Sequence, residues 1–180
     1  MSLLKVIQRL VVFAPLLSLL SCQHPSGTLN NYPGLKSRII DFSSADLEAL
    51  NTDEKVEYVA QNSATIVLIV LKGKCESCHL ELNEWQAMIH ENKWEDQAQF
   101  LVVIEEGISY LLEHEIESQS KFSIPIYHDK EGNFITNNNL KPLLYERAAI
   151  LNSNRTIRYV GSPLLKPHLK ASFLKSAGLD

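Results

Sequence analysis

The chain lacks an excess of basic residues, and this absence excludes one class of function. Lys and Arg together number 17 of the 180 residues, against 21 Asp and Glu, so the formal charge is −4 with His neutral. Proteins that bind nucleic acid usually gather Lys and Arg on one face or along one helix. No such cluster is present, so no nucleic-acid partner is expected.

Long hydrophobic runs are also absent, apart from one short run near the N-terminus. Residues 10–20 are mostly apolar and follow Lys5 and Arg9, but they are too few to span a bilayer as a stable helix. The run ends in Leu-Leu-Ser-Cys22, which resembles a bacterial lipobox. The resemblance implies that residues 1–21 are a lipoprotein signal peptide and that Cys22 carries the lipid. An ordinary secretory signal with an incidental cysteine is the alternative.

These features predict a location and a division of the chain. We expect a lipid anchor in the cell envelope of a Gram-negative bacterium, with the protein facing the periplasm. Gln23 follows the lipidated cysteine in place of the Asp that often marks inner-membrane retention, which favours the outer membrane. Residues 22–42 are rich in Pro, Gly and Asn and are predicted to be a tether. Residues 43–180 are predicted to form one domain.

Cysteine is scarce, and this limits what the remaining thiols can do. With Cys22 lipidated, Cys75 and Cys78 are a lone pair in a compartment that permits disulfides. A bridge across two intervening residues closes too short a loop to stabilise the fold much by restricting the unfolded chain. A bond between Cys75 and Cys78 is therefore expected to be redox-active and not structural.

The stretch around these cysteines predicts a strand, a turn and a helix. Residues 66–71 are all apolar and mostly β-branched, as in a strand buried on both faces. Gly73 interrupts that run, and from Cys78 onward apolar residues recur at helical spacing. Cys75 is thereby placed at a helix N-terminus, where unpaired N–H groups and the helix dipole favour a thiolate. A Cys-x-x-Cys pair in that position suits dithiol–disulfide chemistry.

The rest of the chain predicts alternating strands and helices. Two apolar strands separated by helical crossovers indicate a parallel βαβ arrangement, followed by a hairpin with its turn at 152–154. A helix is expected to start at Ser43. The further helices are expected at 53–61, 108–118 and 164–177, and the further strands at 99–104, 124–128, 147–151 and 156–160.

In this order the elements resemble the thioredoxin superfamily over residues 60–178. The closer likeness is to exported reductases of the TlpA/ResA type, related to the redoxin/AhpC-TSA branch. Their active helix commonly reads Cys-Glu-Pro-Cys-x-x-Glu, and the segment from Cys75 to Glu81 keeps both acids. The resemblance implies an α/β fold, a thioredoxin-like three-layer α/β/α sandwich with a central mixed sheet.

The resemblance also implies roles for three residues. Cys75 would be the attacking thiol, Cys78 the resolving thiol, and Glu81 an acid that tunes their protonation. Such a protein would be a thiol–disulfide oxidoreductase acting on protein disulfide or dithiol substrates, without a cofactor. Glu76 and Glu81 would oppose the pull of the nearby lysines on the thiolate, and a less stabilised thiolate suits a reductase.

Some positions depart from the family pattern. Lys72-Gly-Lys74 stands where an aromatic residue usually precedes the first cysteine, and Ser77 replaces a frequent proline. The family places a cis-proline ahead of its third core strand, and the matching site here falls near Glu146-Arg147. Pro142 and Pro125 are the nearby prolines that could serve. The Pro-x-x-x-Thr-x-x-Cys pattern of a peroxiredoxin is absent, so that class is rejected.

Other interpretations of the motif stay open. Cys75-x-x-Cys78-His79 satisfies the c-type haem attachment pattern, although small c-type cytochromes are mostly helical. The two cysteines with a distant histidine could bind copper or zinc. The domain could also be a thioredoxin-like binding module without activity. Glu105 and Glu106 follow the second strand, whose end could line a cleft, but a solvated turn is the favoured interpretation.

Overall fold

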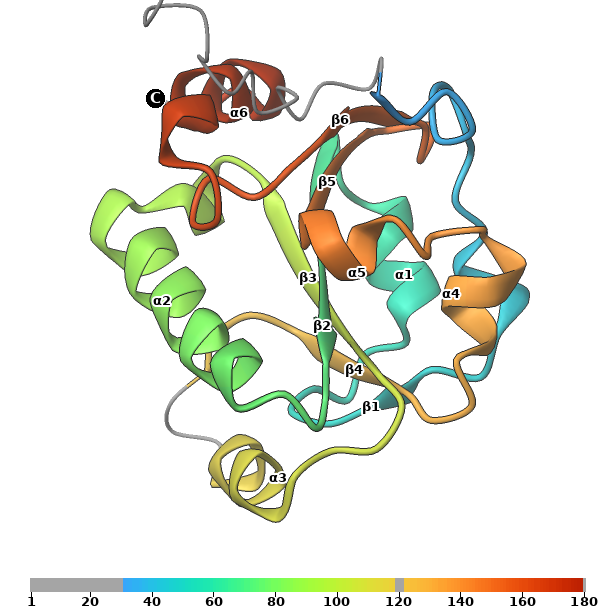
Figure 1. The fold of residues 1–180 in the computed structure, drawn as a ribbon, viewed down its shortest axis with the longest axis vertical. Coiled ribbons are helices and arrows are strands. Elements are labelled where there is room, and N and C mark those ends of the chain that lie inside the picture. The colour runs from blue at the N-terminus through green and yellow to red at the C-terminus, as the bar shows by residue number, and fades with distance from the viewer. Residues whose placement is uncertain (1–30, 119–121, 180) are drawn as a thin grey trace, which may run out of the picture.

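A computed structural model describes residues 31–118 and 122–179 and contains one mixed sheet of six strands (Figure 1). Their order across the sheet is β1-β4-β3-β2-β5-β6. Strands β2, β3 and β4 are parallel, while β1, β5 and β6 run antiparallel to their neighbours. The strands comprise β1 (Glu48–Ala49), β2 (Thr65–Lys72), β3 (Gln99–Glu105), β4 (Ile126–Asp129), β5 (Ala148–Asn152) and β6 (Ile157–Val160).

The middle strand, β2, has no exposure to solvent along its apolar run, as predicted. Side chains of a strand alternate between the two faces of a sheet. Val67, Ile69 and Leu71 accordingly enter one hydrophobic core. Ile66, Leu68 and Val70 enter a second core on the opposite face. Two separate cores on one strand make this a three-layer structure, which confirms the predicted α/β class.

Helices cover both faces of the sheet (Figure 1). The first core contains residues from α2 (Glu76–Asn92), α3 (Tyr110–Glu117) and α6 (Lys170–Ala177). Its largest side chains, Trp85, Trp94, Phe100 and Phe173, are almost wholly buried. The second core lies under the short helices α1 (Val56–Gln61), α4 (Asn133–Asn137) and α5 (Leu143–Glu146). The predicted βαβ unit and hairpin are both present.

The N-terminal part of the described chain differs from the prediction. Leu35, Ile40 and Phe42 are buried in the second core, although residues 22–42 were expected to be tether. Ile39 also forms a β-bridge with Thr156. Residues 31–42 therefore pack against the fold, because their apolar side chains belong to the same core as those of α4. The signal peptide and Cys22 lie outside the described residues.

The helix expected at Ser43 is wrong. Asp41, not Ser43, accepts the capping hydrogen bond, and the turn it caps is a 3-10 helix at Phe42–Ser44. The following residues form β1, which pairs with the edge of β4. Pairing with an open sheet edge prevailed over the local helix-start signal.

Gly73 is needed where β2 meets the turn before α2. Its N–H donates to the Glu105 carbonyl, and its own carbonyl accepts from the Ser109 N–H. A Cβ at Gly73 would lie 2.3 Å from the carbonyl oxygen of Gly107. The two loops that follow β2 and β3 thus touch backbone to backbone at a position that has no room for a side chain.

Gly73→Ala is expected to lower the free energy of unfolding by about 2 kcal/mol, because the Gly107 backbone has to move. Gly34→Ala is the matched control, since no atom lies within 4 Å of its added Cβ. Chemical denaturation measures both. Equal stability of the two variants would contradict the proposed close packing.

Candidate active site

The two cysteines lie where strand, turn and helix place them. Cys75 caps the N-terminus of α2, and its N–H donates to the Lys72 carbonyl at 3.1 Å. Cys75 is half-buried, whereas Cys78, one turn further, is 1% exposed and belongs to the first core. One sulfur is therefore within reach of solvent and the other is covered. Both cysteines are free thiols in this structure.

The two thiols differ in acidity for identifiable reasons. Hydrogen bonds from the Cys78 thiol and the Ser77 hydroxyl, together with the positive charge of Arg147, lower the pKa of Cys75 to about 7. The Ser77 Oγ lies 3.0 Å from the Cys75 sulfur. Burial is the main cause that raises the pKa of Cys78 to about 11. Near neutral pH Cys75 therefore ionises far more readily than Cys78.

Glu81, predicted as the third site residue, lies one turn beyond Cys78 and is 7% exposed. Burial raises the pKa of its carboxyl, and the charge of Arg147 opposes that rise. The Arg147 Nε lies 3.6 Å from Glu81 Oε2. Arg147 comes from the turn between α5 and β5, so two segments far apart in sequence meet beside the cysteine pair. The sequence analysis gave Arg147 no role.

A cavity of about 210 Å³ opens beside Cys75. Residues 72–75 line one side and residues 105–107 the other. Glu105 is half-buried there, and its burial raises the pKa of its carboxyl. The carboxyl ends of β2 and β3 adjoin in the parallel pair, which brings Glu105 into this cavity. Glu106 is exposed, as expected for the solvated turn that the sequence favoured. Glu105 is half-buried, so that expectation does not describe it.

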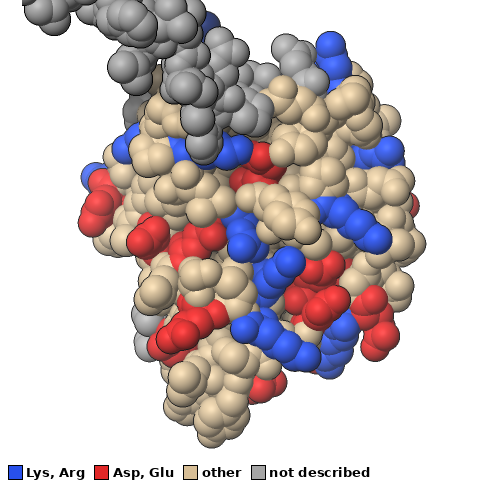
Figure 2. Space-filling view, in the orientation of Figure 1, with Lys and Arg blue, Asp and Glu red and all other residues tan. Residues whose placement is uncertain are grey.

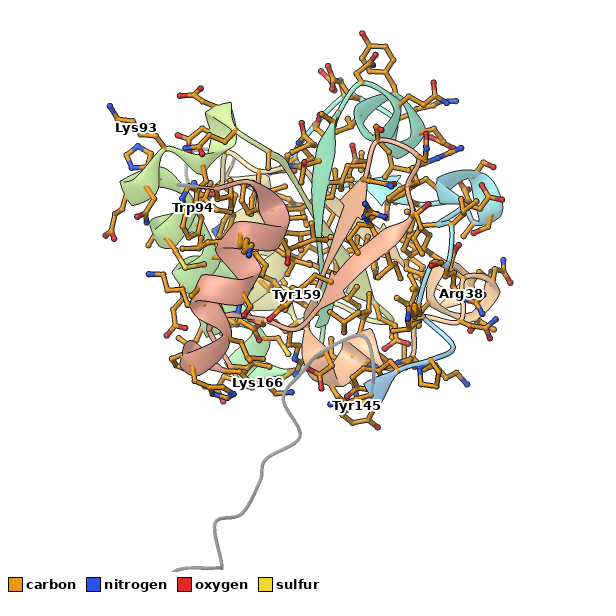
Figure 3. All side chains as sticks on the ribbon, turned by 90° about the horizontal axis from the view of Figure 1, so that it is seen from above. Arg38, Lys93, Trp94, Tyr145, Tyr159 and Lys166 are labelled. Atoms are coloured by element: carbon orange, nitrogen blue, oxygen red, sulfur yellow. The ribbon has the colours of Figure 1, made fainter. Side chains whose placement is uncertain are left out.

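The surface near the cavity carries both charges and an exposed aromatic side chain. The Lys72 Nζ lies over the Tyr145 ring, 5.5 Å from its centroid. Tyr145 is 74% exposed, and Figure 3 shows it at the edge of the molecule. On the face drawn in Figure 2, basic side chains run through the middle with acidic ones on both sides. Neither charge sign dominates this face.

His79, the residue that completes the haem-attachment pattern, is engaged with another helix. Its Nε2 lies 2.7 Å from the Glu115 carboxylate of α3, so it links α2 to α3. Within residues 31–118 and 122–179, no three His, Cys, Asp or Glu side chains gather in a way that could hold a metal ion. The same ranges contain no helix with the length and hydropathy to cross a membrane.

Solved structures share this arrangement of strands and helices. The reduced N-terminal domain of PilB from N. meningitidis superposes with a TM-score of 0.55, over 77% of this chain and 96% of that one, at 11% identity. A thioredoxin-like protein from Porphyromonas gingivalis gives 0.51, over 79% and 91%, at 14% identity. The fold is thioredoxin-like. A Chlorobium tepidum protein that carries the name thiol:disulfide interchange protein DsbE gives 0.50, over 75% and 96%, at 14% identity.

These similarities establish the thioredoxin-like fold predicted from the sequence. They are similarities of structure, because no model of a known protein family matches the sequence and no curated protein matches it either.

This thioredoxin-like domain departs from the expected pattern at one position near the cysteines. No peptide bond among the described residues is cis, so neither Pro125 nor Pro142 is the expected cis-proline. Arg147 occupies the matching position, with φ of 66° in the left-handed region. Its N–H donates to the Leu143 carbonyl and its carbonyl accepts from the Val70 N–H, at 2.7 and 2.8 Å. Its backbone is thus fully used within the protein.

The reactivity of Cys75 is expected to follow its lowered pKa. The alkylation rate should rise with pH and reach half its maximum near pH 7, because only the thiolate reacts, instead of near 9 as for an ordinary thiol. Ser77→Ala should move the midpoint upward by removing a donor to the thiolate. Rates measured with iodoacetamide between pH 5 and 10 test both. A wild-type midpoint near 9 would refute the stabilised thiolate.

Proposed function

We propose that this chain is a thiol–disulfide oxidoreductase that acts on protein disulfides through Cys75 and Cys78. The observation that carries the proposal is the division of labour between the two sulfurs. Cys75 is accessible, lies at a helix N-terminus and has a pKa near 7, whereas Cys78 is buried behind it and protonated. Attack by one thiol and resolution by a second require that difference. The thioredoxin-like fold supports the same conclusion.

The reaction proceeds in two exchanges. The Cys75 thiolate attacks one sulfur of the substrate disulfide, which forms a mixed disulfide and releases the other substrate sulfur as a thiolate that takes a proton from solvent. Cys78 then loses its proton to solvent and attacks the Cys75 sulfur, and the bond from Cys75 to the substrate breaks as the second substrate sulfur leaves as a thiolate and takes up a proton. The Cys75–Cys78 disulfide forms and the substrate leaves as a dithiol. The substrate gains two electrons and the protein loses two, so a dithiol donor must reduce the protein before the next cycle.

The proposed direction is reduction of the substrate. A strongly acidic first cysteine stabilises the reduced protein and makes it an oxidant, with pKa values down to about 3.5, whereas reductants have values of about 7. Cys75 belongs with the second group. The buried carboxylate of Glu81 lies close to Arg147 and partly offsets its positive charge. This offset limits how far Arg147 lowers the pKa of Cys75. Glu81 is accordingly proposed as the acid that tunes the pair.

The proposed location is the periplasmic side of a Gram-negative envelope, with a lipid on Cys22 and attachment to the outer membrane. The support is the lipobox-like sequence and the absence of Asp after Cys22. A disulfide-permissive compartment also suits a redox-active pair.

The haem alternative has less support from the site. Thioether attachment needs both sulfurs at one accessible face, whereas Cys78 lies in the core. Ligation of iron would also require His79 to leave Glu115. Cys78 packs in the core and His79 links α2 to α3. Disulfide exchange leaves both contacts in place and needs no rearrangement of α2. A Soret absorption band in protein isolated from the periplasm would reverse this choice.

Substitution of each cysteine separates the two exchanges. Cys75→Ser should reduce a disulfide-bonded test peptide no faster than buffer, because the attacking thiolate is gone. Cys78→Ser should instead accumulate a mixed disulfide with the peptide on Cys75, visible by mass spectrometry. Retention of activity in Cys75→Ser would remove the enzymatic proposal, and an adduct on Cys78 in Cys75→Ser with none in Cys78→Ser would reverse the assigned roles.

The anchor is tested in cells. Cys22→Ala should leave the protein unlipidated and move it from the membrane fraction, as followed by incorporation of labelled palmitate and by fractionation. Cys75→Ala serves as the control, because it removes a cysteine without touching the lipobox. Labelled lipid on Cys22→Ala would show that the anchor lies elsewhere.

A further inference from the structure

Three segments that are distant in sequence meet at the buried carboxylate of Glu146, the residue before Arg147. Glu146 is buried, and its carboxylate accepts a hydrogen bond from the Tyr32 hydroxyl at 2.5 Å. The Lys166 Nζ donates to both oxygens of the same carboxylate, at 2.6 and 2.8 Å. Tyr32 belongs to the segment ahead of the first buried residue of the domain, and Lys166 to the segment before α6, where Figure 3 shows it. Glu146 ends α5.

This contact fixes a turn that has little intrinsic stability. Arg147 follows Glu146 and adopts φ of 66° and ψ of −27°, in the left-handed region that residues with a Cβ rarely occupy. α5 has only four residues, too few to hold the turn through helical hydrogen bonds alone. The contacts of the Glu146 side chain add to the backbone hydrogen bonds that Arg147 makes with Leu143 and Val70 in holding this conformation.

The two neighbouring side chains reach different partners. Glu146 contacts Tyr32 and Lys166, while Arg147 contacts Glu81 beside the cysteines. Without Tyr32 and Lys166, the Glu146 carboxylate would be buried and poorly paired, and Arg147 is the nearest cation in the sequence that could neutralise it. Any movement of Arg147 toward Glu146 would withdraw its charge from Glu81.

We propose that Tyr32 is a positioning residue of the redox site: through Glu146 and Lys166 it holds the turn that sets Arg147 against Glu81. The role that this inference gives to Tyr32 rests on the proposed function. The contacts themselves do not depend on it. It makes the segment that joins the domain to the predicted anchor a part of the active site. Tyr32 stays a donor at all physiological pH values, because burial and its bond to Glu146 raise its pKa to about 12.

The titration of Glu81 reports the position of Arg147 directly. The charged groups that act on Glu81 are Arg147 across the site and Glu84 on its own helix. An opposite charge a few ångströms away lowers the pKa of a carboxyl by one unit or more. Tyr32→Phe removes only the hydroxyl, so the midpoint of Glu81 should rise by about half a pH unit as Arg147 moves away. Carbon-13 NMR of the Glu81 carboxyl measures it.

Further variants make the test independent of activity. Arg147→Gln should raise the Glu81 midpoint further, and Lys166→Met should raise it as Tyr32→Phe does. Tyr58→Phe is the matched control, because that tyrosine is exposed and lies on α1, and it should change nothing. A wild-type midpoint in both Tyr32→Phe and Lys166→Met would overturn the proposal, as would one in Arg147→Gln. None of these results depends on whether the protein reduces disulfides.

Discussion

The contact between Gly73 and Gly107 fixes the turn that leads from β2 to the Cys75 sulfur. The loops that follow β2 and β3 meet there backbone to backbone, with a hydrogen bond on either side of Gly73. β2 is buried on both faces and cannot shift its register without moving apolar side chains between two cores. The strand thus holds the turn in place. The turn leads to Cys75, which is the N-cap residue of α2. The strand and the turn together place the Cys75 thiol at the edge of the sheet and the Cys78 thiol in the first core.

The chemistry of the pair follows from that difference in depth. Cys75 is the N-cap residue of α2 and Cys78 lies in its first turn, but burial raises the pKa of Cys78 while donors around Cys75 lower its pKa. The Glu81 carboxyl and the Arg147 guanidinium face each other beside the thiols, and the charge of Arg147 opposes the rise that burial gives to the pKa of Glu81. Arg147, from the turn between α5 and β5, lowers the pKa of both thiols through its charge.

Much of this could be predicted because the signals were local. The apolar run of β2, the glycine after it and the helical spacing from Cys78 onward each depend on neighbours in sequence, so strand, turn and helix were correct. The errors occurred where distant segments decide the structure. Ser43 has the composition of a helix start, yet the edge of β4 recruits the residues after it into β1. Residues 31–42 have the composition of a tether, yet three of their apolar side chains fill a core whose other members run from Val56 to Val160. The contact between Arg147 and Glu81 could not be predicted, because the two residues lie far apart in sequence.

The sequence by itself determined the central strand, the helix that follows it and the presence of a thiol pair at their junction. Periodicity and the conformational freedom of glycine act over a few residues, and both can be read without coordinates. Only the tertiary structure decided how far each thiol is exposed, that neither Pro125 nor Pro142 is cis, and that Tyr32, Glu146 and Lys166 meet beside Arg147. Burial and charge pairing depend on distances between segments, and those distances exist only once the two cores have closed around the sheet.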